Sequence, residues 1–192
     1  MEYHILLGAI AIIVGLSGFI PYFIDIIHGK TKPHAFSWLI WSLSPTIVFS
    51  AQISRGGGAG AWLAAAQAVA CLMVFAIALF RGEKEIVLLD KACLLAALLG
   101  VGLWAVMNNP LYAVVLITMV DAVGFVPTFR KSRKRPSEET LIMYALNGLG
   151  FAISLFALQA ISLTTVLYPA SLVLTNFTFV VMVMMRRSSL RK

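Results

Sequence analysis

Apolar residues occur along the chain in seven long runs, which short polar or basic segments separate. Each run has, or nearly has, the length of a helix that crosses a membrane, about 20 residues with a range of about 17–25. A backbone in lipid must satisfy its own hydrogen bonds, so we expect every run to be helical. The runs cover residues 5–27, 35–54, 60–80, 92–107, 110–129, 139–158 and 161–185. The sequence therefore predicts an all-α membrane protein with seven transmembrane helices.

The composition supports this class. Hydrophobic residues make up 60% of the chain and charged residues 12%, whereas a soluble domain has about 25% charged residues. The first apolar run lacks a preceding basic segment and is longer than the core of a cleaved signal peptide, so we expect a retained membrane helix. The net charge of +7 is typical of cytoplasmic loops rich in Lys and Arg. Without a folded soluble part to present a groove, we expect no nucleic-acid partner.

The basic residues predict the orientation of the chain. All but one of the 15 Lys and Arg residues fall in the first, third and fifth loops or in the C-terminal tail, the exception being Arg55. Positive charge accumulates on the cytoplasmic side. We therefore expect a multi-pass protein of the plasma (inner) membrane, with the N-terminus outside and the C-terminus in the cytoplasm.

One stretch of the sequence occurs twice. Residues 14–23 have the sequence Val-Gly-Leu-Ser-Gly-Phe-Ile-Pro-Tyr-Phe, and residues 120–129 have Val-Asp-Ala-Val-Gly-Phe-Val-Pro-Thr-Phe. Each copy precedes a basic loop with its own proline and then another apolar run. A single run between the two units makes them parallel repeats, related by an axis along the membrane normal. We expect a first three-helix repeat at 1–85, a linker helix at 86–108, and a second three-helix repeat with a basic tail at 109–192.

Each repeat carries a matched stripe of polar and aromatic residues at spacings i, i+4 and i+7, which place them on one helix face. The stripes are Ser37, Trp41 and Ser44 in the first repeat and Thr140, Tyr144 and Asn147 in the second. Gln67 and Asn176 are the polar candidates in the third and last runs. If the stripes face each other, they form a pocket for a small polar, uncharged solute. The alternative is that these residues only join helices by hydrogen bonds.

Asp121 is an acidic residue inside an apolar run. It lies nine residues before Arg130, which is about 13 Å inside the membrane boundary at 1.5 Å per residue. A carboxylate at that depth is costly, so we expect it to face the protein interior. It is a candidate for coupling a proton or a cation. The alternative is a protonated Asp that bonds to a neighbouring helix.

Prolines inside three apolar runs are candidate hinges. A proline removes one backbone hydrogen bond and bends a helix, and these prolines lie near the predicted cytoplasmic ends. The candidate hinges are Pro21, Pro45 and Pro127, with Gly148 at the fourth equivalent position. A static kink is the alternative interpretation.

Catalytic signatures are absent from the sequence, which has no HExxH, GxSxG or CxxC motif. The cysteines, Cys71 and Cys93, lie in apolar runs without metal-ligand spacing. We therefore expect no enzyme, no cofactor and no metal site.

The arrangement of three spans, a linker and three spans, with GFIPYF at 18–23 and GFVPTF at 124–129, resembles the PQ-loop superfamily, which includes the SWEET sugar transporters. The family's dipeptide is Pro-Gln, where this chain has Pro-Tyr and Pro-Thr. The resemblance implies alternating access between two three-helix bundles, hinge prolines, and an Asn in the third and seventh spans, which Asn176 could match. The element Trp38-Leu-Ile-Trp41 is similar to one in Pnu-type vitamin facilitators, and residues 29–34 resemble bacterial membrane proteins.

Together these observations predict a transporter of a small polar solute, sugar-like or vitamin-like, in contact with membrane lipid. The alternative is a receptor or scaffold that has the same fold and binds without transporting, as sorting receptors of this superfamily do. Homo-oligomerisation is left open.

Overall fold

The computed structural model describes residues 2–106 and 109–190, and every regular element in those ranges is helical. The predicted ends of the fourth run at 107 and of the linker at 108, like residues 1, 191 and 192, lie outside them. The longer helices in chain order are α1 (Glu2–Ser17), α2 (Phe19–Ile27), α3 (Ala35–Ser54), α4 (Trp62–Arg81), α5 (Leu88–Ala105), α6 (Pro110–Lys134), α7 (Leu141–Phe156) and α8 (Leu163–Ser189). Two short 3₁₀ turns are η1 (Gly58–Ala61) and η2 (Pro136–Glu138).

Five helical stretches are long and apolar enough to cross a membrane. They are Glu2–Ile27, Ala35–Ser54, Gly58–Arg81, Pro110–Lys134 and Leu163–Ser189. The helix α7 is a shorter apolar helix of 16 residues, and α5 has 18. Large apolar side chains such as Phe80 and Leu174 are exposed on the outer surface, as lipid-facing residues are. These features indicate a membrane protein.

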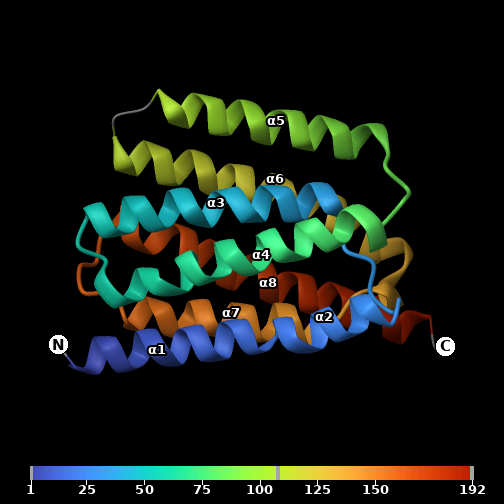
Figure 1. The fold of residues 1–192 in the computed structure, drawn as a ribbon, viewed down its shortest axis with the longest axis horizontal. Helices are drawn as coiled ribbons and strands as arrows, with labels where there is room; N and C mark the ends of the chain where they lie inside the picture. Colours follow the sequence, from blue (N-terminus) through green and yellow to red (C-terminus); the bar gives the residue numbers. More distant parts are fainter. Residues whose placement is uncertain (1, 107–108, 191–192) are drawn as a thin grey trace.

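The helices lie side by side along the long axis of the molecule, and the two termini lie at opposite ends (Figure 1). We call the end with loops 28–34, 82–87 and 135–140 the basic end, because most of the Lys and Arg residues lie there. The other end, with η1 and loop 157–162, is called the N-terminal end.

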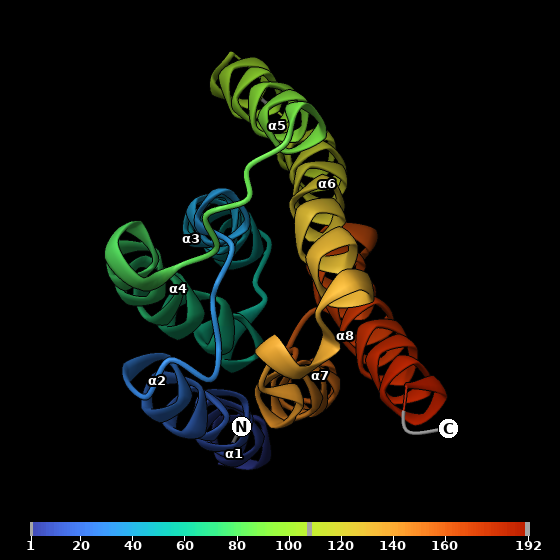
Figure 2. The same cartoon turned by 90° about the vertical axis from the view of Figure 1, so that its right-hand side faces the viewer.

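The packing divides the chain into two halves, α1–α4 and α6–α8. In the first half, α4 contacts both α1 and α3; in the second, α8 contacts both α6 and α7. The halves meet along two seams, α1 against α7 and α3 against α6. The helix α5 packs mainly on α6, at the edge of the bundle (Figure 2).

Matching glycines make matching contacts across the two seams. A Cβ at Gly18 would lie 2.8 Å from the Cα of Met143, and a Cβ at Gly124 would lie 3.0 Å from Cγ2 of Ile40. In the alignment of the repeats Met143 and Ile40 are equivalent, each one residue before the matched aromatic. Both seams therefore depend on a glycine at the same place to bring two helices into close contact.

The first long helix is interrupted near one predicted hinge. The helix α1 ends at Ser17 and α2 begins at Phe19. Pro21 has no N–H to donate to the carbonyl of Ser17, so one bond of the helix is missing there. The helices α3, α6 and α7 continue through Pro45, Pro127 and Gly148. Movement at these positions stays a prediction.

Candidate functional site

A small cavity lies between the two halves, at the middle depth of the bundle. Its volume is about 20 Å³, and one water molecule needs about 10–15 Å³ in the same measure. Six helices contribute to its wall. The lining residues are Phe19, Trp38, Trp41, Gln67, Cys71, Phe125, Met143, Tyr144, Asn147, Leu172 and Asn176. In this conformation the cavity has room for about one water molecule and no larger solute.

Three amide side chains form the polar part of the wall. The Nδ2 of Asn147 donates to Oε1 of Gln67 at 2.9 Å, and the Nδ2 of Asn176 lies 3.4 Å from Oδ1 of Asn147. Asn176 also donates to the backbone carbonyl of Leu172 at 2.8 Å. The amides thus come from α4, α7 and α8 and bond to one another in the cavity wall. A polar solute could replace these bonds without leaving an amide unpaired.

Aromatic rings form the wall of the cavity on the side of the basic end. The ring centroids of Trp38 and Trp41 are 5.2 Å apart, and those of Trp41 and Phe125 are 4.5 Å apart. The ring of Tyr22, which is not part of the lining, packs against Trp38 with the ring centroids 5.1 Å apart.

The structure brings five predicted site residues together in the cavity wall: Trp41, Gln67, Tyr144, Asn147 and Asn176. The other members of the stripes lie outside it. The Ser44 hydroxyl donates to the carbonyl of Ile40 in its own helix, at 3.1 Å. Ser37 accepts a hydrogen bond from Thr128, at 3.0 Å, and Thr140 bonds to residues of the first half. The hydroxyls of Ser37 and Thr140 therefore join the two halves in this conformation, whereas that of Ser44 bonds within α3.

Asp121 is buried and lies beside the cavity wall. Its carboxylate accepts a hydrogen bond from the hydroxyl of Tyr168 at 3.0 Å. Its backbone carbonyl lies 3.4 Å from the indole nitrogen of Trp41. The side chain faces the protein interior, as its depth predicts, and is connected to the cavity through Trp41.

A polar cluster joins the two halves at the basic end. We call the residues Asp25, Thr31, Lys32, Lys131, Glu139 and Thr140 the basic-end cluster. Lys131 is only 2% exposed; its ammonium group pairs with the Glu139 carboxylate and donates to the backbone carbonyl of Lys32. Thr140 donates to Asp25 at 2.8 Å and shares a hydrogen bond with Thr31 at 2.5 Å. The cluster therefore connects loop 28–34 of the first half to α6 and α7 of the second.

One side chain connects this cluster to the cavity. Tyr144 lines the cavity, and its hydroxyl donates to Oε2 of Glu139 at 3.2 Å. Burial raises the pKa of Glu139 above its ordinary value, and the neighbouring Lys131 only partly opposes this shift. A change at the cavity wall can thus reach the buried carboxyl group of Glu139 at the basic end.

Sequence reasoning missed several residues of the site. Trp38 precedes Trp41 by three positions, and Cys71 follows Gln67 by four, so helical spacing alone could have found both. Lys131 and Glu139 carried no such signal, because their pairing depends on how α6, η2 and α7 fold together.

The arrangement has the chemistry of a binding site for a neutral polar molecule. Indole and phenol rings offer flat apolar surfaces, amides offer donors and acceptors, and none of the residues lining the cavity carries a formal charge.

Comparison of the chain with protein-family models, curated proteins and solved structures finds no match.

Proposed function

We propose that the protein is a membrane transporter that carries a small polar solute by alternating access between two three-helix bundles. The observation that carries this proposal is the cavity at the seam of the two halves, whose wall includes the matched pair Trp41 and Tyr144. A site between two repeats can face either side of a membrane in turn as one repeat rocks against the other.

The packing supports two parallel repeats. In the alignment of the repeats, α1 corresponds to α6, α3 to α7 and α4 to α8. Each contact that a helix of the first set makes with another helix of either set has a counterpart made by the corresponding helix of the second set. Exchanging the two sets leaves the pattern unchanged, as a two-fold axis along the membrane normal requires. In this proposal α5 and α7 also cross the membrane. The repeats then cover residues 1–85 and 109–192, and the linker covers 86–108.

The resemblance to the PQ-loop and SWEET-like superfamily supports the same architecture. The distribution of Lys and Arg supports an inner-membrane protein with the basic end in the cytoplasm. The N-terminus would then lie outside.

The structure corresponds to a closed state in this mechanism. The cavity of about 20 Å³ is too small for a sugar or a vitamin. Contacts between the halves lie on both sides of it: the hydrogen bonds of the basic-end cluster on one, and close helix packing on the other. Opening either end would admit a solute to the amides and indoles. The absence of charge in the lining favours a neutral solute.

Asp121 is a candidate coupling residue. Its hydrogen bond with Tyr168 and its link to Trp41 place it where a change of protonation would alter the cavity wall. Asp121→Asn should abolish pH-driven solute uptake if the residue couples a proton. Unchanged pH dependence would exclude that role.

A native cysteine allows a test before the solute is known. Cys71 lines the cavity and is 1% exposed. In a Cys93→Ser background, a membrane-impermeant maleimide should modify Cys71 slowly from either side of oriented vesicles, because each end opens in turn. Labelling from one side only would contradict alternating access and favour the receptor. Vesicles screened with sugars and vitamins then distinguish flux from binding.

A further inference from the structure

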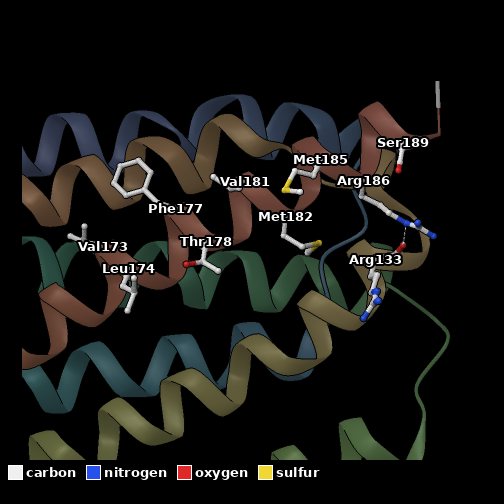
Figure 3. A pocket seen from close by; sticks show the side chains of 10 residues that line it. All are labelled: Arg133, Val173, Leu174, Phe177, Thr178, Val181, Met182, Met185, Arg186 and Ser189. Carbon is white, nitrogen blue, oxygen red and sulfur yellow. Dashed lines mark hydrogen bonds between the residues drawn. The ribbon is translucent and has the colours of Figure 1, made fainter. Parts of the chain in front are cut away.

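The outer face of α8 carries a long groove toward the basic end (Figure 3). Its volume is about 780 Å³. We call it the α8 groove, and its lining is Arg133, Val173, Leu174, Phe177, Thr178, Val181, Met182, Met185, Arg186 and Ser189. Most of these side chains are apolar, and Leu174, Val181 and Met185 are each more than half exposed.

The groove has the length of one membrane leaflet. From Val173 to Arg186 the helix rises about 20 Å at 1.5 Å per residue. One leaflet with its headgroup region contributes about half of a bilayer thickness of about 40–45 Å. Val173 lies near the middle of α8, so the apolar part runs from mid-membrane to the basic end, as an extended acyl chain does.

Two guanidinium groups close the groove at the basic end. Arg186 donates through Nε to the backbone carbonyl of Arg133 at 3.1 Å, and Figure 3 shows this bond. Both side chains are exposed, and neither forms an ion pair with a carboxylate within residues 2–106 and 109–190. Guanidinium groups bind phosphate oxygens through paired hydrogen bonds. Their position at the mouth of an apolar groove matches a phosphodiester attached to an acyl chain.

We infer that the α8 groove binds an anionic glycerophospholipid of the leaflet at the basic end. Its acyl chain lies along Val173 to Met185, and its phosphodiester contacts Arg133 and Arg186. A second copy of the chain fits less well, because a two-fold dimer in the membrane would bring four guanidinium groups together at one depth. This inference is independent of whether the protein transports a solute.

Native mass spectrometry of the detergent-purified full chain tests the inference. Phosphatidylglycerol should bind more tightly than phosphatidylcholine with the same acyl chains. Arg133→Gln with Arg186→Gln should weaken phosphatidylglycerol binding by about tenfold or more, because each basic contact contributes to anionic-lipid affinity. The matched control, Lys30→Gln with Lys91→Gln, removes the same charge from exposed positions near the same end and should leave the affinity within about twofold.

The apolar part of the groove has its own test. Val181→Trp fills the groove and should lower phosphatidylglycerol binding while both arginines remain. Equal binding of the two lipids by the unmodified chain would overturn the inference, as would equal losses in the arginine and lysine variants. A dimer that Val181→Trp dissociates would also overturn it, since the groove would then hold a second copy.

Discussion

The two ends of the seam between the halves are closed by different physical means. At the basic end, the contacts across the seam include the hydrogen bond from the buried Lys131 ammonium group to the backbone carbonyl of Lys32, the ion pair of Lys32 with Glu138 at 3.1 Å, and the hydrogen bond from Thr140 to Asp25. The carboxylate that pairs with Lys131, that of Glu139, lies in the same half as Lys131. Toward the N-terminal end, small residues bring backbones together. One end therefore depends on charge and hydrogen bonding, and the other on shape.

The close packing toward the N-terminal end leaves no room for a methyl group. A Cβ on Gly150 would lie 2.6 Å from the Cα of Gly15, and a Cβ on Gly60 would lie 2.8 Å from the backbone nitrogen of Leu158. The contacting atoms belong to the backbone, so they cannot move aside as a flexible side chain can. Each pair joins one half to the other.

This difference predicts which conditions affect each end. Charged groups that leave a closed interface regain hydration, which offsets part of the interaction they lose. Small residues that separate lose dispersion contacts and gain only lipid or water in exchange. Opening of the basic end should therefore respond to pH and to removal of a charge, and opening of the N-terminal end to side-chain volume.

Lys131→Gln should cause the largest difference between the two ends in the rate of Cys71 labelling. The change leaves the Glu139 carboxylate buried without its cation, and breaking a buried pair in this way costs about 3–5 kcal/mol. The closed state should lose much of its advantage. We expect Cys71 labelling from the basic end to accelerate about tenfold or more, with labelling from the N-terminal end unchanged or slower.

The double variant Lys131→Gln with Glu139→Gln is the control for that result. Because burial raises the pKa of Glu139, a neutral side chain there favours closure. The second substitution should therefore restore slow labelling. If the double variant labels as fast as the single one, the unpaired carboxylate is not the cause and the charge-based account of this end is wrong.

Gly150→Ala should have the next largest effect, at the other end of the comparison. Its methyl group would press on the backbone of α1, and overpacking of this kind costs about 1–3 kcal/mol. The thermal midpoint of the purified chain should fall, or labelling of Cys71 from the N-terminal end should rise. Gly102→Ala is the matched control, since a Cβ there meets no atom within 4 Å. An equal fall in both variants would refute the role of close packing.

Much of the fold could be predicted from the sequence because a chain that crosses lipid has few alternatives to a helix. Apolar runs of membrane-spanning length became helices, and five of them meet the length and hydropathy of membrane spans. The exact helix ends were less predictable. The first helix breaks between Ser17 and Phe19, several residues before Pro21. The reason is that a proline at position 21 cannot donate a hydrogen bond to the carbonyl of Ser17, four positions earlier.

The site was predictable where both repeats carried the same signal. Trp41 and Tyr144 match in the alignment and line one cavity, and Asn147 meets the amides of Gln67 and Asn176. The depth of each side chain along the helix axis was harder to predict from residue spacing. Ser37 shares a helix face with Trp41, but four residues place it about 6 Å nearer the basic end. Lys131 appeared as one of several basic residues, and only tertiary packing distinguishes its buried side chain.

A pH titration of Cys71 labelling should give a smaller effect, limited to the basic end. The groups facing Glu139 are Lys131 of α6, Tyr144 of α7 and Arg187 of α8, besides its neighbour Glu138. Burial gives Glu139 a higher pKa in the closed state than in a hydrated open state, so protonation favours closure. As the pH rises through that pKa, labelling from the basic end should increase.

Dividing each Cys71 labelling rate by the rate of the Glu139→Gln variant at the same pH removes the pH dependence of the Cys71 thiol itself. The corrected rate from the N-terminal end should stay flat across the same range. A corrected rate at the basic end that falls as the pH rises would show that the Lys131–Glu139 attraction outweighs burial, and would reverse the sign of our argument.

Glu85→Gln should have the smallest effect and marks the limit of the comparison. Glu85 is partly exposed at the basic end and bonds to the exposed side chains of Lys134 and Arg135, at 3.0 Å in each case. The hydrogen bond from Lys134 holds the pKa of Glu85 below its ordinary value. Its ion pairs are therefore fully present above the ordinary pKa and are lost as the pH falls through the lowered pKa. Exposed ion pairs contribute little because water screens them. We expect no measurable change in thermal midpoint or Cys71 labelling at neutral pH. A large change would mean that burial does not decide which charges matter, and that loop 82–87 takes part in closing the seam.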